Sequence, residues 1–132
     1  MEIIWKDVYS VGNEIIDKQH QKIFEILSKL ENAQLHEKEI LLKETLQEFS
    51  DYVNTHFKTE ETFMERWGVP EDYLKAHKRE HLLEKIAVNN LIEKHYKSEE
   101  LFLSVELVDE LKNWVISHVL GTDREYIPYI KD

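Results

Sequence analysis

The sequence predicts an all-α fold, namely an up-down-up-down antiparallel four-helix bundle with an N-terminal arm and a short C-terminal helical turn. Apolar residues recur at alternating steps of three and four over four long segments, which is the spacing of one helix face. No segment alternates apolar and polar residues as a strand would. The segments are joined by short connections, which favour antiparallel neighbours.

Length and composition indicate one soluble domain over residues 1–132, with an arm at 1–12, a four-helix bundle at 13–120 and a turn at 121–132. The net charge of −10 argues against nucleic acid or an anionic membrane surface as a partner. The absence of cysteine excludes disulfides and thiolate-bound metals. No signal peptide is evident, and no apolar run approaches the roughly twenty residues that span a bilayer. We therefore expect a cytoplasmic monomer with no membrane insertion.

The first residues of the chain are apolar without a helical stripe, so we expect an arm that lies across the bundle surface. The first helix should begin after Asn13, a suitable N-cap residue, and end near Gln34. Its apolar face carries Ile16, His20, Ile23, Phe24, Leu27 and Leu30. A single histidine on such a face is more often a satisfied core residue than a metal ligand. His20 therefore gains meaning only together with other candidate ligands.

The second helix should run from about Lys38 to Trp67, where a glycine and a proline end it. Its apolar stripe consists of Leu42, Leu46, Phe49, Val53, His56, Glu60, Phe63 and Trp67. Two ionisable side chains, His56 and Glu60, thus occupy the same face one helical turn apart. Burying them costs several kcal/mol unless each is strongly paired, and a metal ion would provide that pairing. For this motif alone, a hydrogen-bonded core pair is the more common explanation.

The third helix should begin at residue 70 or 71 and run to about residue 96. Its inward face carries a second ionisable pair one turn apart, His77 and His81. Two further polar residues, Glu84 and Lys85, interrupt the same face. The third helix therefore adds two candidate ligands to those of the second.

The fourth helix should cover about residues 99–120, with His118 facing inward near its end. Asp123 follows five residues later, which places it off the inward face of a straight helix. The break at Gly121 could swing Asp123 back towards the same point. The end of the fourth helix thus supplies one histidine and one carboxylate.

Seven residues from the four helices and the final turn form a candidate metal site: His20, His56, Glu60, His77, His81, His118 and Asp123. A closed zinc site needs only four ligands, so this set is too large for one zinc ion. One core histidine would not indicate a metal site, whereas five histidines with two carboxylates point to metal binding.

Coordination counting suggests two metal ions in this site. One would be bound by the three histidines of the third and fourth helices, and the other by the two histidines of the first and second. Glu60 and Asp123 would bridge both ions, together with an oxo or hydroxo group. The second ion would then have one coordination position open, although counting alone does not fix which histidines belong together. Imidazole and carboxylate ligands suit iron, with manganese the nearest competitor.

The segments that carry these ligands resemble the hemerythrin family, in particular its single-domain bacterial members. The matching positions are Trp5, Gly12–His20, His56–Glu61, His77–His81 and His118–Asp123. The resemblance covers nearly the whole chain, and no ligand position is missing. It supports the division of the histidines given above and implies that both metal ions are iron.

The resemblance implies reversible dioxygen binding at a non-haem di-iron centre, for oxygen storage or delivery to oxygen-requiring enzymes, without enzymatic activity. It also implies that four apolar residues line the oxygen site: Ile23, Phe57, Trp114 and Val119. Ordinary core packing would account for the same four residues, and the two roles are compatible. Gln19 and Asp17 are candidates for outer contacts with the metal ligands.

Two other functions stay open on the sequence alone. One is oxygen or redox sensing, in which the chain would act through a signalling partner. The other is a di-iron peroxidase or oxidase, or a protein that detoxifies iron or nitric oxide. Dioxygen is the expected ligand of a carrier, and an oxygen-consuming enzyme is its expected recipient.

Overall fold

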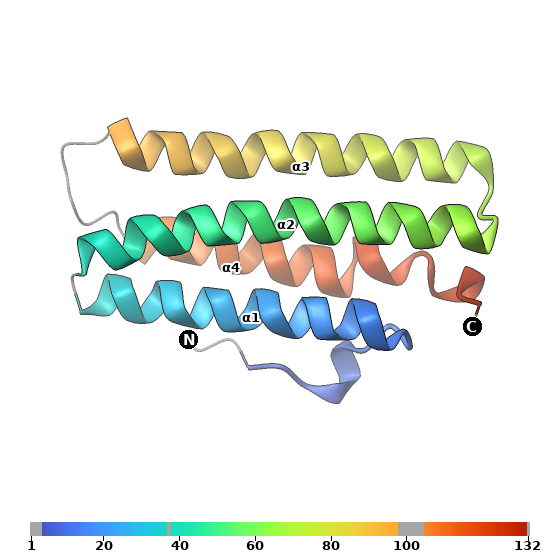
Figure 1. Ribbon diagram of the computed structural model, residues 1–132, viewed down its shortest axis with the longest axis horizontal. Helices are drawn as coiled ribbons and strands as arrows, with labels where there is room; N and C mark the ends of the chain where they lie inside the picture. The colour runs from blue at the N-terminus through green and yellow to red at the C-terminus, as the bar shows by residue number, and fades with distance from the viewer. Residues whose placement is uncertain (1–3, 37, 98–104, 132) are drawn as a thin grey trace.

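The computed structural model describes residues 4–36, 38–97 and 105–131, and these residues contain helices and no strand. Four α-helices follow one another along the chain: α1 (Glu14–Leu35), α2 (Glu39–Trp67), α3 (Glu71–Lys97) and α4 (Val105–Leu120). Successive helices run in opposite directions, as the colours of Figure 1 show. The predicted up-down-up-down bundle is therefore confirmed. No helix in the described ranges is both long and apolar enough to cross a membrane.

The helix ends lie within one residue of the predicted ones wherever the structure describes them. Asn13 caps α1, because its side-chain oxygen accepts a 3.0 Å hydrogen bond from the backbone N–H of Ile16. Gly68 ends α2 in a left-handed conformation, with φ at 68°, which glycine adopts without strain. The predicted start of the fourth helix, near Glu99, lies outside the described residues.

The N-terminal arm packs against α1 through aromatic side chains. It contains one short 3-10 helix, η1 (Asp7–Tyr9). The rings of Trp5 and Tyr9 each meet the ring of Phe24 edge-on, with centroids 5.6 Å apart. From residue 4 onwards, the arm therefore lies on the bundle surface as expected.

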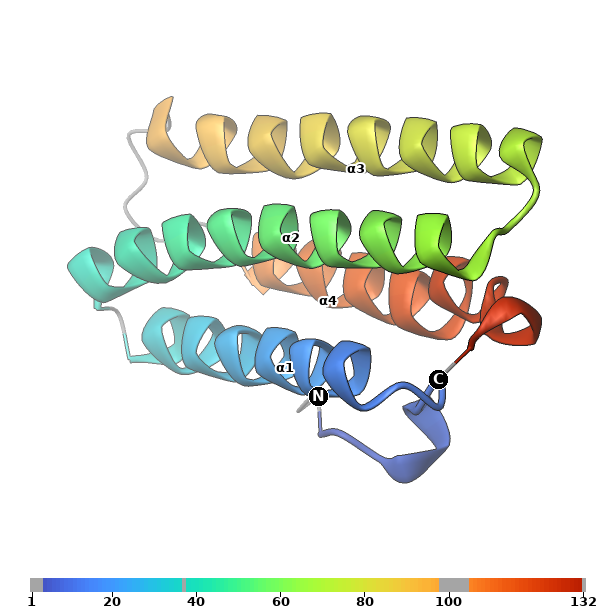
Figure 2. The same cartoon turned by 45° about the vertical axis from the view of Figure 1, so that its right-hand side comes forward.

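The arm also contacts the segment that follows α4. This segment contains two 3-10 helices, η2 (Thr122–Arg124) and η3 (Ile127–Tyr129). Arg124 donates a 3.1 Å hydrogen bond to the backbone carbonyl of Val8 in the arm. Figure 2 shows the arm and the C-terminal segment at the same end of the bundle.

Two apolar clusters fill the bundle, and buried polar residues lie between them. The larger cluster lies among the four helices and includes Ile23, Leu27, Phe49, Phe57, Leu111 and Val119. The smaller cluster consists of Val11, Ile16, Met64, Trp67, Val69 and Tyr126. On α1, His20 falls between Ile16 of the smaller cluster and Ile23 of the larger one. The polar layer thus crosses the bundle at the level of the predicted metal site.

Candidate metal centre

The structure brings all seven predicted ligands together in the buried polar layer, where each is at most 1 % exposed. Their potential ligand atoms form two groups, and within each group all atoms lie within 4.8 Å of one another. One group contains His20, His56, Glu60, His118 and Asp123, and the other Glu60, His77, His81 and Asp123. The two carboxylates belong to both groups, which is the position expected of bridging ligands.

His118 is the one residue whose group differs from the predicted division of the histidines. Its Nε2 lies 2.8 Å from Asp123 Oδ2 and 3.3 Å from His56 Nε2, so it falls with the histidines of α1 and α2. It also lies 3.4 Å from Glu60 Oε1, the same distance as Nε2 of His81 on α3. His118 therefore stands beside the shared carboxylates, and its assignment to one ion stays a prediction.

Asp123 reaches the centre because the chain turns sharply at the end of α4. A side chain at Gly121 would place its Cβ 2.5 Å from the backbone oxygen of Ser117, so the turn requires glycine. The following 3-10 helix carries Asp123 back into the bundle, where its Oδ2 lies 2.6 Å from Nε2 of His20. The sequence suggested this change of direction, because Gly121 interrupts the helix just before Asp123.

Several buried polar atoms of the centre have no hydrogen-bond partner in the described part of the chain, including Asp123 Oδ1, His77 Nε2 and His20 Nδ1. Each such atom costs about 1–3 kcal/mol when it is left unpaired. In addition, Nε2 of His20 and Nε2 of His56 lie only 3.1 Å apart. Converging nitrogens and carboxylate oxygens of this kind are the donor set of a transition-metal site. The residues therefore fit the iron ions that the sequence suggests.

Opposite charges in the centre stabilise one another against the cost of burial. Burial disfavours the charged form of His56, but Glu60 and Asp123 outweigh it and raise the pKa of His56 to about 9. Burial is likewise outweighed at His118, chiefly by Asp123, and its pKa lies well above its usual value. Burial alone would raise the pKa of Glu60, yet the neighbouring histidines hold this pKa well below its usual value. A bound cation would replace the protons on these histidines.

One of the two predicted outer contacts is present, and the other is not. Gln19 accepts a 2.9 Å hydrogen bond at Oε1 from Nδ1 of His56. Asp17 instead binds the N-terminal arm, since its carboxylate accepts hydrogen bonds from the Ser10 hydroxyl and the Val11 N–H. The prediction for Asp17 is therefore wrong, because its side chain binds the N-terminal arm and not a residue of the buried polar layer.

Two glutamates that the sequence did not assign to the site lie behind histidine ligands. Glu61 Oε2 is 3.1 Å from Nδ1 of His81, and Glu84 Oε2 is 3.4 Å from Nδ1 of His118. The sequence could have indicated Glu84, because this residue interrupts the apolar face of α3. Glu61 had none, because it lies beside the stripe of α2 at a position that the periodicity leaves to solvent.

Tyr126 is a further residue that the sequence did not assign. Its hydroxyl donates a 2.7 Å hydrogen bond to Oε2 of Glu60, and the side chain is fully buried. Burial, with Asp123 and Glu60 nearby, raises the pKa of Tyr126 well above its usual value, so the phenol keeps its proton. Tyr126 thereby holds one oxygen of a shared carboxylate in place.

The four apolar residues predicted around the oxygen site all belong to the larger cluster or pack against it. The ring of Phe57 stacks on His81, with centroids 4.0 Å apart, and the ring of Trp114 stacks on His118 at 5.3 Å. Ile23 and Val119 are buried. These side chains form an apolar wall on one side of the centre, and their contact with dioxygen stays a prediction.

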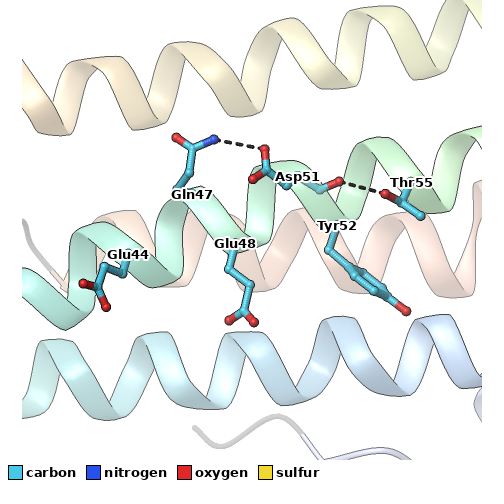
Figure 3. Close-up of a pocket in the computed structure, with 6 residues that line it drawn as sticks. All are labelled: Glu44, Gln47, Glu48, Asp51, Tyr52 and Thr55. Carbon is cyan, nitrogen blue, oxygen red and sulfur yellow. Dashed lines mark hydrogen bonds between the residues drawn. The ribbon is translucent and has the colours of Figure 1, made fainter.

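A hollow of about 510 Å³ lies on the surface of α2 (Figure 3). Its lining residues are Glu44, Gln47, Glu48, Asp51, Tyr52 and Thr55. Gln47 donates a hydrogen bond to Asp51, and Glu48 pairs with Lys29 of α1. None of these residues belongs to the predicted ligand set, so the hollow is separate from the buried centre.

Comparison with a family model places this chain among known metal-binding domains. The model of the hemerythrin HHE cation binding domain matches residues 11–130. That span contains all seven predicted ligands.

Individual proteins with similar sequences and structures cover nearly the same length. Bacteriohemerythrin of Stenotrophomonas maltophilia is 33% identical over 131 residues, which are 98% of this chain and 82% of the relative. Bacteriohemerythrin of Clostridium acetobutylicum is 32% identical over 130 residues, with 94% and 98% of the two chains covered. A crystal structure of wild-type hemerythrin matches with a TM-score of 0.84 and 26% identity over 97% of both chains.

Proposed function

Because the chain belongs to the hemerythrin family, we propose that it binds dioxygen reversibly at a non-haem di-iron centre and so stores oxygen or delivers it to oxygen-requiring enzymes. The observation that carries the proposal is the pair of ligand groups that share Glu60 and Asp123. One carboxylate that contacts several histidines is frequent in a polar core. Two carboxylates that each belong to both groups of histidines are the arrangement that two adjacent metal ions need.

We assign the ligands to two irons with different numbers of histidines. His77, His81 and His118 bind one, which we call the three-histidine ion. His20 and His56 bind the other, the two-histidine ion. Glu60 and Asp123, which belong to both groups of ligand atoms, would be shared by the two irons together with an oxo or hydroxo group. The two-histidine ion has one protein ligand fewer, so dioxygen has room beside it.

The ligand set favours binding and release of dioxygen over its cleavage. When bound, the two irons supply the two electrons that dioxygen takes up on binding and returns on release. Di-iron oxidases built in similar bundles use a larger share of glutamate ligands. Here five imidazoles accompany two carboxylates, and fewer anionic ligands stabilise highly oxidised iron less well. A carrier that returns dioxygen unchanged is the function that this balance supports.

The apolar wall supports the same function by a second route. Phe57 and Trp114 stack on ligand histidines, and Ile23 and Val119 are buried beside them. Such a wall keeps water and small anions from the iron, where they would compete with dioxygen or promote irreversible oxidation.

The test is anaerobic reconstitution with ferrous iron followed by repeated exposure to air and argon. We expect two irons per chain and an optical spectrum that returns to its starting form after each cycle. An oxidase or peroxidase would instead consume dioxygen continuously. A ratio near one iron per chain, or zinc in preference to iron in purified protein, would contradict the proposal.

Replacing the indole at position 114 should shorten the life of the oxygenated protein. Trp114→Ala should retain both irons, since the side chain stacks on His118 without being a ligand. The gap should admit water and anions, so oxidation to the diferric form should be faster by about ten-fold or more. The measurement is the decay of the oxygenated spectrum in air, and Trp114→Phe is the control that keeps the wall apolar. Equal decay of the parent and the alanine variant would leave Trp114 as core packing alone.

A further inference from the structure

Two histidines of the metal centre have a carboxylate behind them. Glu61 of α2 lies 3.1 Å from Nδ1 of His81 on α3, and Glu84 of α3 lies 3.4 Å from Nδ1 of His118 on α4. The two glutamate side chains are only 23% and 21% exposed, so solvent screens their charges weakly. The Oε2 of Glu84 and the Nδ1 of His118 have no hydrogen-bond partner within the described ranges. A small shift of either group would therefore complete a hydrogen bond between them.

The histidine of α2 has a neutral partner instead. The Thr59 hydroxyl donates its proton to the backbone carbonyl of Thr55, so its oxygen can only accept from the Gln19 amide nitrogen, 3.0 Å away. This contact turns the amide oxygen of Gln19 towards Nδ1 of His56 at 2.9 Å. The Nδ1 of His56 must then carry the proton, which leaves its Nε2 free to bind metal. The amide fixes this tautomer without adding charge.

We propose that Glu61 and Glu84 are positioning residues that strengthen iron binding at the three-histidine ion and stabilise its ferric form. A carboxylate that accepts the Nδ1 proton raises the basicity of Nε2 more strongly than the neutral amide oxygen of Gln19 does. The three-histidine ion therefore loads first and leaves last. This inference rests on the proposed function, because it takes the division of ligands between the two irons as its starting point.

The experiment compares charge-changing variants that keep the side-chain shape. Glu61→Gln and Glu84→Gln each remove one outer carboxylate, and Gln19→Glu adds one behind His56. Glu65→Gln is the control, because Glu65 lies one turn after Glu61 on α2 and binds Lys78, with a side chain 57% exposed. Each protein is loaded with ferrous iron under argon, and the iron is counted. The loss of each iron to a ferrous chelator is then timed, and the reduction potential is measured.

The parent should lose its irons in two steps. Glu61→Gln and Glu84→Gln should each speed the slower step by about ten-fold. They should also raise the reduction potential, and a ten-fold change in ferric preference corresponds to about 59 mV for one electron. Gln19→Glu should slow the faster step, and Glu65→Gln should change neither step. A role limited to packing would leave the potential unchanged in all four variants.

The proposal is overturned if Glu61→Gln and Glu84→Gln lose iron at the parent rate and keep its reduction potential. It is also overturned if Gln19→Glu speeds the loss of the first iron. Failure of the parent to take up two irons would instead contradict the proposed function. Thermal melting of the chelated proteins controls for folding. If one of the three test variants does not fold, the other two test variants decide the question against Glu65→Gln.

Discussion

Removal of iron by a chelator should lower the thermal midpoint of unfolding by at least about 10 °C. Each ion present at a thousand times its Kd stabilises the folded chain by about 4 kcal/mol. Two ions together would therefore contribute about twice that, and each kcal/mol is worth roughly 2–8 °C for domains near this size. The expected destabilisation has a structural cause, because buried atoms such as Asp123 Oδ1 and His77 Nε2 have no hydrogen-bond partner among the described residues. Thermal melts by circular dichroism before and after chelation measure the effect.

Addition of ferrous iron to the chelated protein should restore the original midpoint, which controls for irreversible damage. An unchanged midpoint would mean that the pairing of His56 and His118 with the carboxylates compensates the centre fully. In that case the buried charges would stabilise one another as well as a metal does.

The second large effect is expected when a histidine ligand is removed. His118→Ala should reduce the iron content from two to at most one per chain, because water in the gap leaves the three-histidine ion with only two protein nitrogens. Its carboxylate neighbour, Asp123, would also lose a contact of 2.8 Å. Metal analysis after anaerobic reconstitution measures the loss. His36→Ala is the matched control, since His36 is an exposed histidine at the end of α1. A His118→Ala protein that retains two irons would remove His118 from the ligand set.

The burial of most of the predicted ligands could be foreseen because they interrupt a regular pattern. His20, His56 and Glu60 occupy positions on helical stripes that otherwise hold apolar residues, and burial follows from the stripe. Asp123 was the harder case, since only the glycine that ends α4 indicated a change of direction. Periodicity and a single breaking residue were therefore enough to place the seven predicted ligands in the core.

The outer contacts could not be predicted in the same way. Glu61 and Tyr126 reach the centre from positions fixed by the rotation of one element against another, and a stripe of apolar residues does not encode that rotation. Asp17 failed for the complementary reason, because its nearest polar partners belong to the arm and not to a neighbouring helix. Of the contacts between elements, the sequence identified that of Gln19 with His56, whereas those of Glu61 and Tyr126 required the structure.

The turn at Gly121 has a consequence for how the chain acquires its metal during synthesis. The turn carries Asp123 back into the bundle, and this carboxylate lies 103 residues after His20, its neighbour in α1. Ribosomes add about 5–20 residues per second, and a domain generally folds as a unit. A nascent chain therefore exposes the predicted ligands of α1, α2 and α3 well before His118 and Asp123 are made. Products that end before residue 123 lack that carboxylate, so they cannot form the two groups of predicted ligands that share Asp123.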